Sequence, residues 1–181
     1  MRAAFLLLLA PFALAACDSG QVPSPADRQA GADAAEAVDP GRVALHGEGL
    51  VAGAEAFYFA AGRTEVEAAL ARILGKPGSS AEGQPCGAGR IDSATYADAL
   101  TVNFQNDVLV GWTLTRALDA IAVDADATIG TAQDAVEDAP GFLRIEDSTL
   151  GDEFSLGENL GGIIENGEVS VLYAGTQCFS R

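Results

Sequence analysis

The order of the elements predicted along this chain constrains its fold more than any other sequence feature. An amphipathic helix pattern over residues 64–74 precedes a hairpin pattern over residues 99–114, where apolar and polar residues alternate about a polar turn. The same order returns over residues 131–141 and 159–175. Because neither copy alone could shield an apolar sheet face, we expect the two to share a core. The predicted fold class is α+β, with two tandem helix-plus-antiparallel-hairpin repeats packed into one domain.

Individual residues predict where these elements begin and end. Thr64 and Glu67 have the spacing of a capping box, and Gly75 is expected to end the first helix. Thr131 is the candidate cap of the second helix. The apolar face of the first helix consists of Val66, Ala69, Leu70, Ile73 and Leu74. The two hairpin turns are expected at Asn106-Asp107 and at Asn166-Gly167.

The first sixteen residues have the layout of a secretory signal peptide. Arg2 is followed by an apolar run that is shorter than the roughly 20 residues needed to span a bilayer. Residues 14–16 (LAA) and Cys17 resemble the lipobox of bacterial lipoproteins, in which the cysteine is lipidated. This resemblance implies a membrane anchor at Cys17 on the bacterial cell envelope, facing the periplasm, and Asp18 resembles a residue that favours the inner membrane. An ordinary signal peptide with an accidental cysteine is the alternative.

Residues 17–41 are predicted to form a disordered, lipidated tether. They contain no aromatic residue, three prolines and only two isolated valines, too little apolar surface to offset the entropy of the chain. The folded domain is therefore expected over residues 42–181, with repeat one at about 42–118 and repeat two at about 119–181.

The charge of the chain limits its partners. It carries 26 acidic and 10 basic residues, a net charge of −16. Lys76 is the one lysine, and the arginines are scattered singly. Because nucleic-acid binding depends on clustered basic side chains, we expect no nucleic-acid partner. The acidic residues of the second repeat are interpreted as solvated faces, among them Glu137, Asp138, Glu146, Asp147, Asp152 and Glu153.

Two cysteines, Cys86 and Cys178, remain for the folded domain. In an oxidising compartment an even number favours a disulfide, and two free thiols or a metal site are the alternatives. With His46 as the single histidine, the ligands are too few for a closed zinc site. Cys86 and His46 could act as nucleophile and base, but nothing in the sequence brings them together. We therefore expect no catalytic set.

Two further motifs have some features of ligand sites. Residues 42–56 are rich in glycine, but no helix-length amphipathic segment separates these glycines from the next apparent strand, residues 56–60, as a dinucleotide-binding unit requires, so we expect a glycine-rich surface loop. Asp124 and Asp126 resemble the start of a calcium loop, but Ile129 and Ala135 stand where glycine and glutamate are needed. A solvated acidic turn is the favoured interpretation and a loose calcium site the alternative. We expect no metal and no cofactor.

Aromatic residues are expected mainly in the core. An aromatic side chain on an uncovered sheet face can anchor a protein partner. The candidates for such protein binding are Tyr58, Tyr96 and Trp112.

Residues 62–78 (GRTEVEAALARILGKPG), Tyr96 and residues 100–112 (LTVNFQNDVLVGW) resemble the repeat of bacterial envelope lipoproteins of the BamE (SmpA/OmlA) type. They are also similar to the tandem fold of the β-lactamase inhibitor protein, BLIP. The similarity covers residues 57–114 moderately and residues 127–178 weakly. It implies a non-enzymatic, lipid-anchored envelope protein that acts as a protein-binding or assembly scaffold. An inhibitor of a hydrolase, a protease or a β-lactamase, is the alternative, although no inhibitor loop can be mapped onto these residues.

Overall fold

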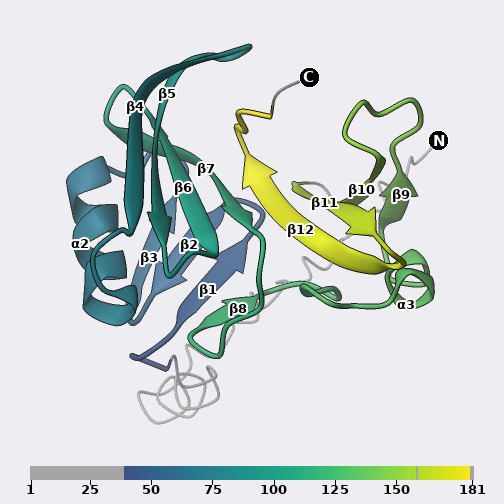
Figure 1. Ribbon diagram of the computed structural model, residues 1–181. Coiled ribbons are helices and arrows are strands. Elements are labelled where there is room, and N and C mark those ends of the chain that lie inside the picture. Colours follow the sequence, from purple (N-terminus) through teal and green to yellow (C-terminus); the bar gives the residue numbers. More distant parts are fainter. Residues whose placement is uncertain (1–38, 158, 180–181) are drawn as a thin grey trace, which may run out of the picture. The chain divides into compact units, whose positions relative to one another are not determined.

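The computed structural model describes residues 39–157 and 159–179 (Figure 1). The predicted signal peptide, Cys17 and residues 18–38 of the tether lie outside the described residues and stay predictions. Within the described residues there are two short helices and twelve strands, which form one sheet of four strands and one of eight. This confirms the α+β class predicted from the sequence. Neither of these helices is long and apolar enough to cross a membrane.

The smaller sheet has the strand order β3-β2-β1-β8. Its strands are β1 (Val43–His46), β2 (Gly49–Ala52), β3 (Glu55–Tyr58) and β8 (Ile121–Val123). Strand β1 pairs antiparallel with β2 and parallel with β8. Because Val43, Leu45 and Leu50 are fully buried, the expectation of a glycine-rich surface loop over residues 42–56 is wrong. Gly53, with φ 63°, supplies the turn between β2 and β3.

The larger sheet has the order β4-β5-β6-β7-β12-β11-β10-β9, and all its neighbouring strands are antiparallel. One half consists of β4 (Ser79–Cys86), β5 (Gly89–Tyr96), β6 (Leu100–Gln105) and β7 (Val108–Leu114). The other half consists of β9 (Phe142–Arg144), β10 (Asp152–Leu156), β11 (Leu160–Glu165) and β12 (Glu168–Gly175). We call them the N-terminal half and the C-terminal half. Strands β7 and β12 join them in the middle of the sheet (Figure 1).

Each half of the larger sheet is preceded in the chain by one helix. Helix α2 (Arg63–Leu74) comes before β4–β7, and the one-turn helix α3 (Gln133–Glu137) comes before β9–β12 (Figure 1). The predicted hairpins are present as β6–β7 and β11–β12. Asn106, Asp107, Asn166 and Gly167 all have positive φ, as type I′ turns require. The outer strands β4, β5, β9 and β10 extend each hairpin to four strands, beyond what the sequence predicted.

Both predicted helix caps are wrong. Helix α2 begins at Arg63 after Gly62 without a side-chain cap, and Glu67 accepts a hydrogen bond from Arg63 Nε at 2.8 Å instead. Helix α3 has no side-chain cap either, since the hydroxyl of Thr131 accepts a hydrogen bond from the backbone nitrogen of Thr128 at 2.9 Å. Gly75 ends α2 with φ 80°, as predicted.

One face of the larger sheet forms the core together with the helices and the smaller sheet. Its largest fully buried side chains are Trp112, Tyr96, Phe104 and Phe154. The indole nitrogen of Trp112 donates a hydrogen bond to the backbone oxygen of His46 at 3.0 Å, which links the two sheets. Tyr96 and Trp112 are both 0% exposed, so their prediction as protein-binding residues is wrong: their strand positions direct them into the core.

Candidate functional site

The two faces of the larger sheet differ because side chains along a strand point alternately to opposite sides. We call the face opposite the core the open face. In the N-terminal half, the register places on it Ser93, Thr95, Thr101, Asn103 and Thr113. In the C-terminal half, it places there Glu153, Ser155, Gly161, Ile163, Val171 and Tyr173. Hydroxyls and an amide therefore line the first half, and a carboxylate, a phenol and aliphatic groups line the second.

On the N-terminal half, the open face is hydrogen-bonded to residues 176–179, which follow β12. Asn103 Nδ2 donates to the backbone oxygen of Thr176 at 3.0 Å and to Oε1 of Gln177 at 3.1 Å. Thr113 Oγ1 donates to the same Oε1 at 2.5 Å. The amide nitrogen of Gln177 donates to two backbone oxygens, at 3.0 and 2.6 Å. The chain itself therefore occupies the polar groups at the centre of this half.

The predicted disulfide between Cys86 and Cys178 is confirmed. Cys86 is the last residue of β4, and its Cα lies 5.4 Å from that of Cys178 across 92 residues of sequence. Phe179 lies edge-to-face against Tyr173, with ring centroids 5.1 Å apart. Residues 176–179 are thus tied covalently to the N-terminal half and contact the C-terminal half through an aromatic pair.

Glu153 is the central polar residue of the C-terminal half. It was predicted to be solvated, but it is only 3% exposed, so that prediction is wrong. The hydroxyl of Tyr173 donates to its Oε1 at 2.5 Å, and the hydroxyl of Ser148 donates to its Oε2. Both donors are neutral, and no ion pair of Glu153 is found within residues 39–157 and 159–179.

A glycine on β11 makes the contact between Tyr173 and Glu153 geometrically feasible. Gly161 lies between the strands that carry these residues, and a Cβ at this position would overlap the Tyr173 ring. On the opposite face, Gly162 makes the same kind of room for the ring of Phe154. The Gly-Gly pair that starts β11 therefore admits one aromatic ring on each face of the sheet.

Next to Glu153 there is a cavity of about 680 Å³. Its walls come from the turn between β4 and β5, from Glu153 and Tyr173 of the C-terminal half, and from residues 175–179. A second cavity of about 420 Å³ shares Tyr173 and Gly175 with the first and extends to Ile145 and Phe59. The open face of the C-terminal half is therefore hollowed on both sides of Tyr173, at a size that suits side chains or small ligands.

The edge strand β9 adds exposed apolar side chains to this face. Leu143 lies opposite Ser155 in register, which places it and Ile145 on the open face. Their exposed fractions are 67% and 39%. Together with Tyr58, they are the large hydrophobic side chains exposed in the described part of the chain.

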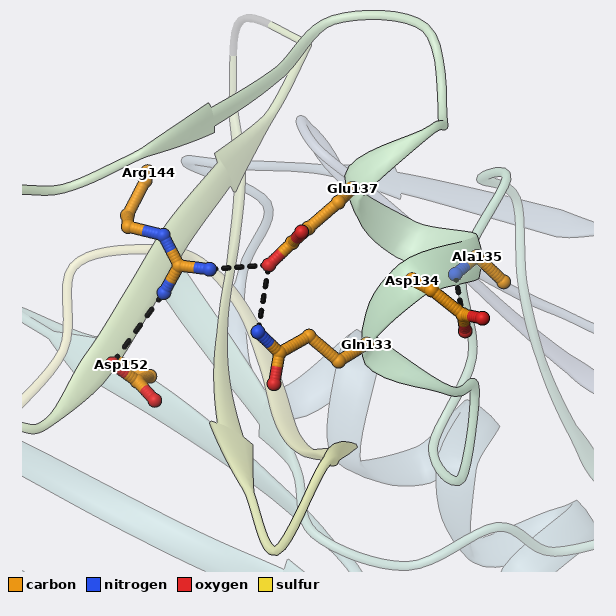
Figure 2. Close-up of polar contacts among 6 residues, drawn as sticks. All are labelled: Gln133, Asp134, Ala135, Glu137, Arg144 and Asp152. Carbon is orange, nitrogen blue, oxygen red and sulfur yellow. Dashed lines mark hydrogen bonds and ion pairs between the residues drawn. The ribbon is translucent and has the colours of Figure 1, made fainter.

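The alternate residue, Arg144, lies on the other face of β9 and anchors helix α3 to the sheet. Its guanidinium pairs with Glu137 of α3 and, at 3.4 Å, with Asp152 of β10, while Gln133 donates to Glu137 at 2.7 Å (Figure 2). In the N-terminal half, Arg63 of α2 has the corresponding role. It pairs with Glu67 at 2.8 Å and with Asp92 of β5 at 2.9 Å. Each helix is thus tied to its half of the sheet by one arginine and two carboxylates.

Tyr96, beneath this arginine cluster, carries a buried hydroxyl that no group in the described residues hydrogen-bonds. Burial raises the pKa of Tyr96 to about 12, and the charge of Glu67 adds to the shift while Arg63 opposes it. The hydrogen bond to Glu67 raises the pKa of Arg63. The hydroxyl of Tyr96 is thus shielded from solvent, whereas the side chains of Arg63, Glu67 and Asp92 are partly exposed.

The remaining sequence-based candidates lie apart from the open face. Tyr58 is 60% exposed, and its ring lies 5.7 Å from that of His46. Both line a third cavity of about 610 Å³ with Asp124 and Asp126, which adjoins the cavity of about 420 Å³ because the two share Gly47, Glu48, Asn159 and Leu160. No group of three or more potential metal ligands occurs among the residues that the structure describes. Cys86 belongs to a disulfide, which leaves no free thiol for a nucleophilic pair with His46.

Comparisons with known proteins identify no relative of this chain. No family model matches the sequence, and no curated protein and no solved structure matches it either. The function therefore has to be argued from the site alone. The sequence does not identify four residues of this face as site residues: Leu143, Ile145, Glu153 and Tyr173. Their alternation with core residues indicates that they point away from the core, but it does not indicate which side chains they contact.

Proposed function

We propose that this protein is a non-enzymatic, lipid-anchored envelope protein that faces the periplasm and binds another protein on the C-terminal half of its open face. One observation carries this proposal: Leu143 and Ile145 are exposed on the open face, and Ile145 lines a cavity that shares Tyr173 with the cavity beside Glu153. Exposed apolar side chains next to a cavity with an aromatic wall are typical of a protein interaction site.

The absence of chemistry on this face supports binding rather than catalysis. The carboxylate of Glu153 is hydrogen-bonded to two hydroxyls, and the one histidine of the chain does not line the cavity beside Glu153. The disulfide excludes Cys86 and Cys178 as nucleophiles. The acidic surface, with a net charge of −16, favours a partner that carries positive charge.

A crosslinking experiment tests the docking face. A photo-reactive amino acid replaces Leu143 in the full chain, and the matched control carries it at Ala68, an exposed residue of α2 far from this face in sequence. After irradiation of intact cells, we expect a discrete adduct from position 143 and none from position 68. Equal adducts from both positions, or none from position 143 at equal expression, contradict the proposal.

The anchor is tested separately from the docking face. We expect the Cys17→Ser chain to be found in the soluble fraction with its disulfide intact, because acyl chains hold such a protein at the membrane. Membrane fractionation and electrophoresis under reducing and non-reducing conditions measure both properties. A Cys17→Ser chain that is still processed and membrane-bound contradicts the lipidation.

The alternative proposal is a BLIP-like inhibitor of a hydrolase. The observation that favours it is the strand order, in which a helix followed by four consecutive strands occurs twice around the β7–β12 pair. Such tandem repeats are what the resemblance to the inhibitor implies. The Cys17→Ser chain is titrated against serine proteases and β-lactamases, and an inhibitor is expected to act at micromolar concentration or below. No inhibition in that range contradicts this alternative and leaves the docking proposal standing.

A further inference from the structure

We infer that the cavity beside Glu153, Tyr173 and Phe179 is a pocket for an arginine side chain of the partner. This inference deepens the proposed function and rests on it, since it names the chemistry by which the open face recognises its ligand.

The carboxylate of Glu153 is buried, and no countercharge pairs with it among residues 39–157 and 159–179. It lines the cavity at 3% exposure, and its two donors, Ser148 and Tyr173, are neutral hydroxyls. Burying a charge away from water is costly unless it is paired. An ionised carboxylate has about four acceptor positions, so two hydroxyls leave capacity for further donors. A cationic group in the cavity supplies the missing charge and the missing donors together.

The nearest arginine on the neighbouring strand does not serve this purpose. Arg144 lies on the opposite face of β9, where it pairs with Glu137 and Asp152 (Figure 2). Arg144 is therefore engaged by two carboxylates on the core-facing side of the sheet and does not pair with Glu153 on the open face.

The aromatic wall favours a guanidinium over an ammonium. Tyr173 and Phe179 meet edge-to-face at 75°, and both line the cavity that Glu153 lines. A guanidinium is planar, stacks on aromatic rings and is more weakly hydrated than an ammonium, so it loses less solvation when it enters a pocket. It also presents several N–H donors in a fixed plane, which suits a carboxylate.

Size and long-range charge are consistent with this ligand. The cavity of about 680 Å³ accommodates a long side chain together with part of the backbone that carries it. The net charge of −16 attracts a basic partner from a distance and repels an acidic one.

The test measures binding of small probes to the Cys17→Ser full chain by NMR. The probe is N-acetyl-arginine methylamide, and its matched control is N-acetyl-citrulline methylamide, which has nearly the same shape without the charge. We expect the arginine probe to shift the amide signals of Glu153, Tyr173 and Phe179 and to bind at least tenfold more tightly than the citrulline probe. Equal binding of the two probes, or shifts confined to other acidic residues, overturns the inference. Equal binding of N-acetyl-lysine methylamide overturns the choice of a guanidinium.

Variants locate the interaction. Glu153→Gln is expected to abolish the preference for arginine over citrulline, and Glu146→Gln, the same charge change at an exposed loop residue, is expected to retain it. Phe179→Leu removes one aromatic ring of the cavity without changing a core residue. We expect it to weaken binding of the arginine probe at least threefold. This second variant keeps the inference testable if Glu153→Gln does not fold. An unchanged preference in both variants overturns the inference.

The same variants separate the pocket from the docking face. Glu153→Gln is combined with the photo-reactive residue at position 143, and we expect the yield of the crosslinked adduct to fall at least fivefold. An undiminished adduct overturns the pocket as a partner contact while the docking proposal stands. If the parent chain forms no adduct, the docking proposal fails, and the fragment titration still decides whether the cavity binds arginine.

Discussion

The two halves of the larger sheet share one order of elements but present different open faces. In the N-terminal half, Asn103 and Thr113 are hydrogen-bonded to Gln177 of the chain's own residues 176–179. In the C-terminal half, Leu143 and Ile145 are exposed, Ile145 lines a cavity, and the hydrogen-bond partners of Glu153 within the described residues are neutral. The two halves thus share a backbone pattern, whereas their side chains determine that the chain covers the open face of one half and leaves cavities on the other.

The largest expected loss of stability comes from removing the disulfide that ties residues 176–179 to the N-terminal half. The double variant Cys86→Ser/Cys178→Ser opens a loop of 92 residues, and we expect the free energy of unfolding to fall by roughly 4 kcal/mol. Urea unfolding of the Cys17→Ser chain, with and without the additional changes, measures this loss. Reduction of the parent protein by dithiothreitol is the control and is expected to reproduce it. A loss below about 1 kcal/mol would show that the hydrogen bonds of Gln177 hold the segment without the disulfide.

The next largest effect is a pH-dependent loss of stability caused by Tyr96, the buried phenol of the N-terminal half. The pKa of Tyr96 is raised to about 12 from 10.0, so the unfolded chain releases this proton at lower pH than the folded protein does. Stability from the neutral phenol is therefore complete below pH 10 and is lost as the pH rises towards 12, by about 2 to 3 kcal/mol in total. Urea unfolding at several pH values from 9 to 12 measures the decline. Tyr96→Phe has no phenol to ionise at this position, so a decline as steep in Tyr96→Phe as in the parent chain assigns the effect to other groups.

A smaller effect is expected when the aromatic wall of the C-terminal half is displaced. Gly161→Ala places a methyl group where the Tyr173 ring lies, and we expect a loss of about 1 to 3 kcal/mol, typical of overpacking. Gly78→Ala is the matched control, because its Cβ meets only one side-chain oxygen, at an ordinary distance of 3.4 Å. Thermal unfolding compares the two variants. Equal melting temperatures for both would mean that Tyr173 shifts without cost and that its position over Glu153 is not held by packing.

The smallest effect on stability is expected at the most exposed residue of the C-terminal half. Leu143 is 67% exposed on an edge strand, so Leu143→Ser should change the free energy of unfolding by less than about 0.5 kcal/mol. If the docking proposal is correct, however, the same change should reduce capture of the partner at least fivefold, with the photo-reactive residue moved to position 145. A variant that is stable and still captures its partner at the parent level would remove Leu143 from the interface.

Part of the fold followed directly from short-range patterns. The helix over residues 64–74 was predicted because its apolar side chains recur at helical spacing, and α2 buries Val66, Ala69 and Leu70 as expected. The two inner hairpins were predicted because alternation and turn dipeptides are local signals. Strand β4 (SSAEGQPC) was missed because it contains Gly83 and Pro85 and has no fully buried residue. Its place in the sheet depends on pairing with β5 and not on its own composition.

The candidate site was predicted less well, because burial depends on the partners that a strand acquires. Trp112 and Tyr58 looked alike in sequence, as aromatic residues on or near strands. The structure places Trp112 between the two sheets, where its indole nitrogen reaches His46, and leaves Tyr58 at 60% exposure on the edge strand β3. In sequence, Glu153 resembles any other surface carboxylate. Only the structure brings the hydroxyls of Tyr173 and Ser148 within hydrogen-bond distance of it.

By itself, the sequence determined the α+β class, the order of helices and hairpins, and the cysteine pair suited to a disulfide. These follow from periodicity, turn chemistry and an even number of cysteines, all of which are local or countable properties of the chain. Only the tertiary structure decided which face of the larger sheet is open and which residues surround Glu153. The physical reason is that the pairing of β7 with β12 and the return of residues 176–179 over the sheet bring together groups that are up to about 90 residues apart, as Cys86 and Cys178 are.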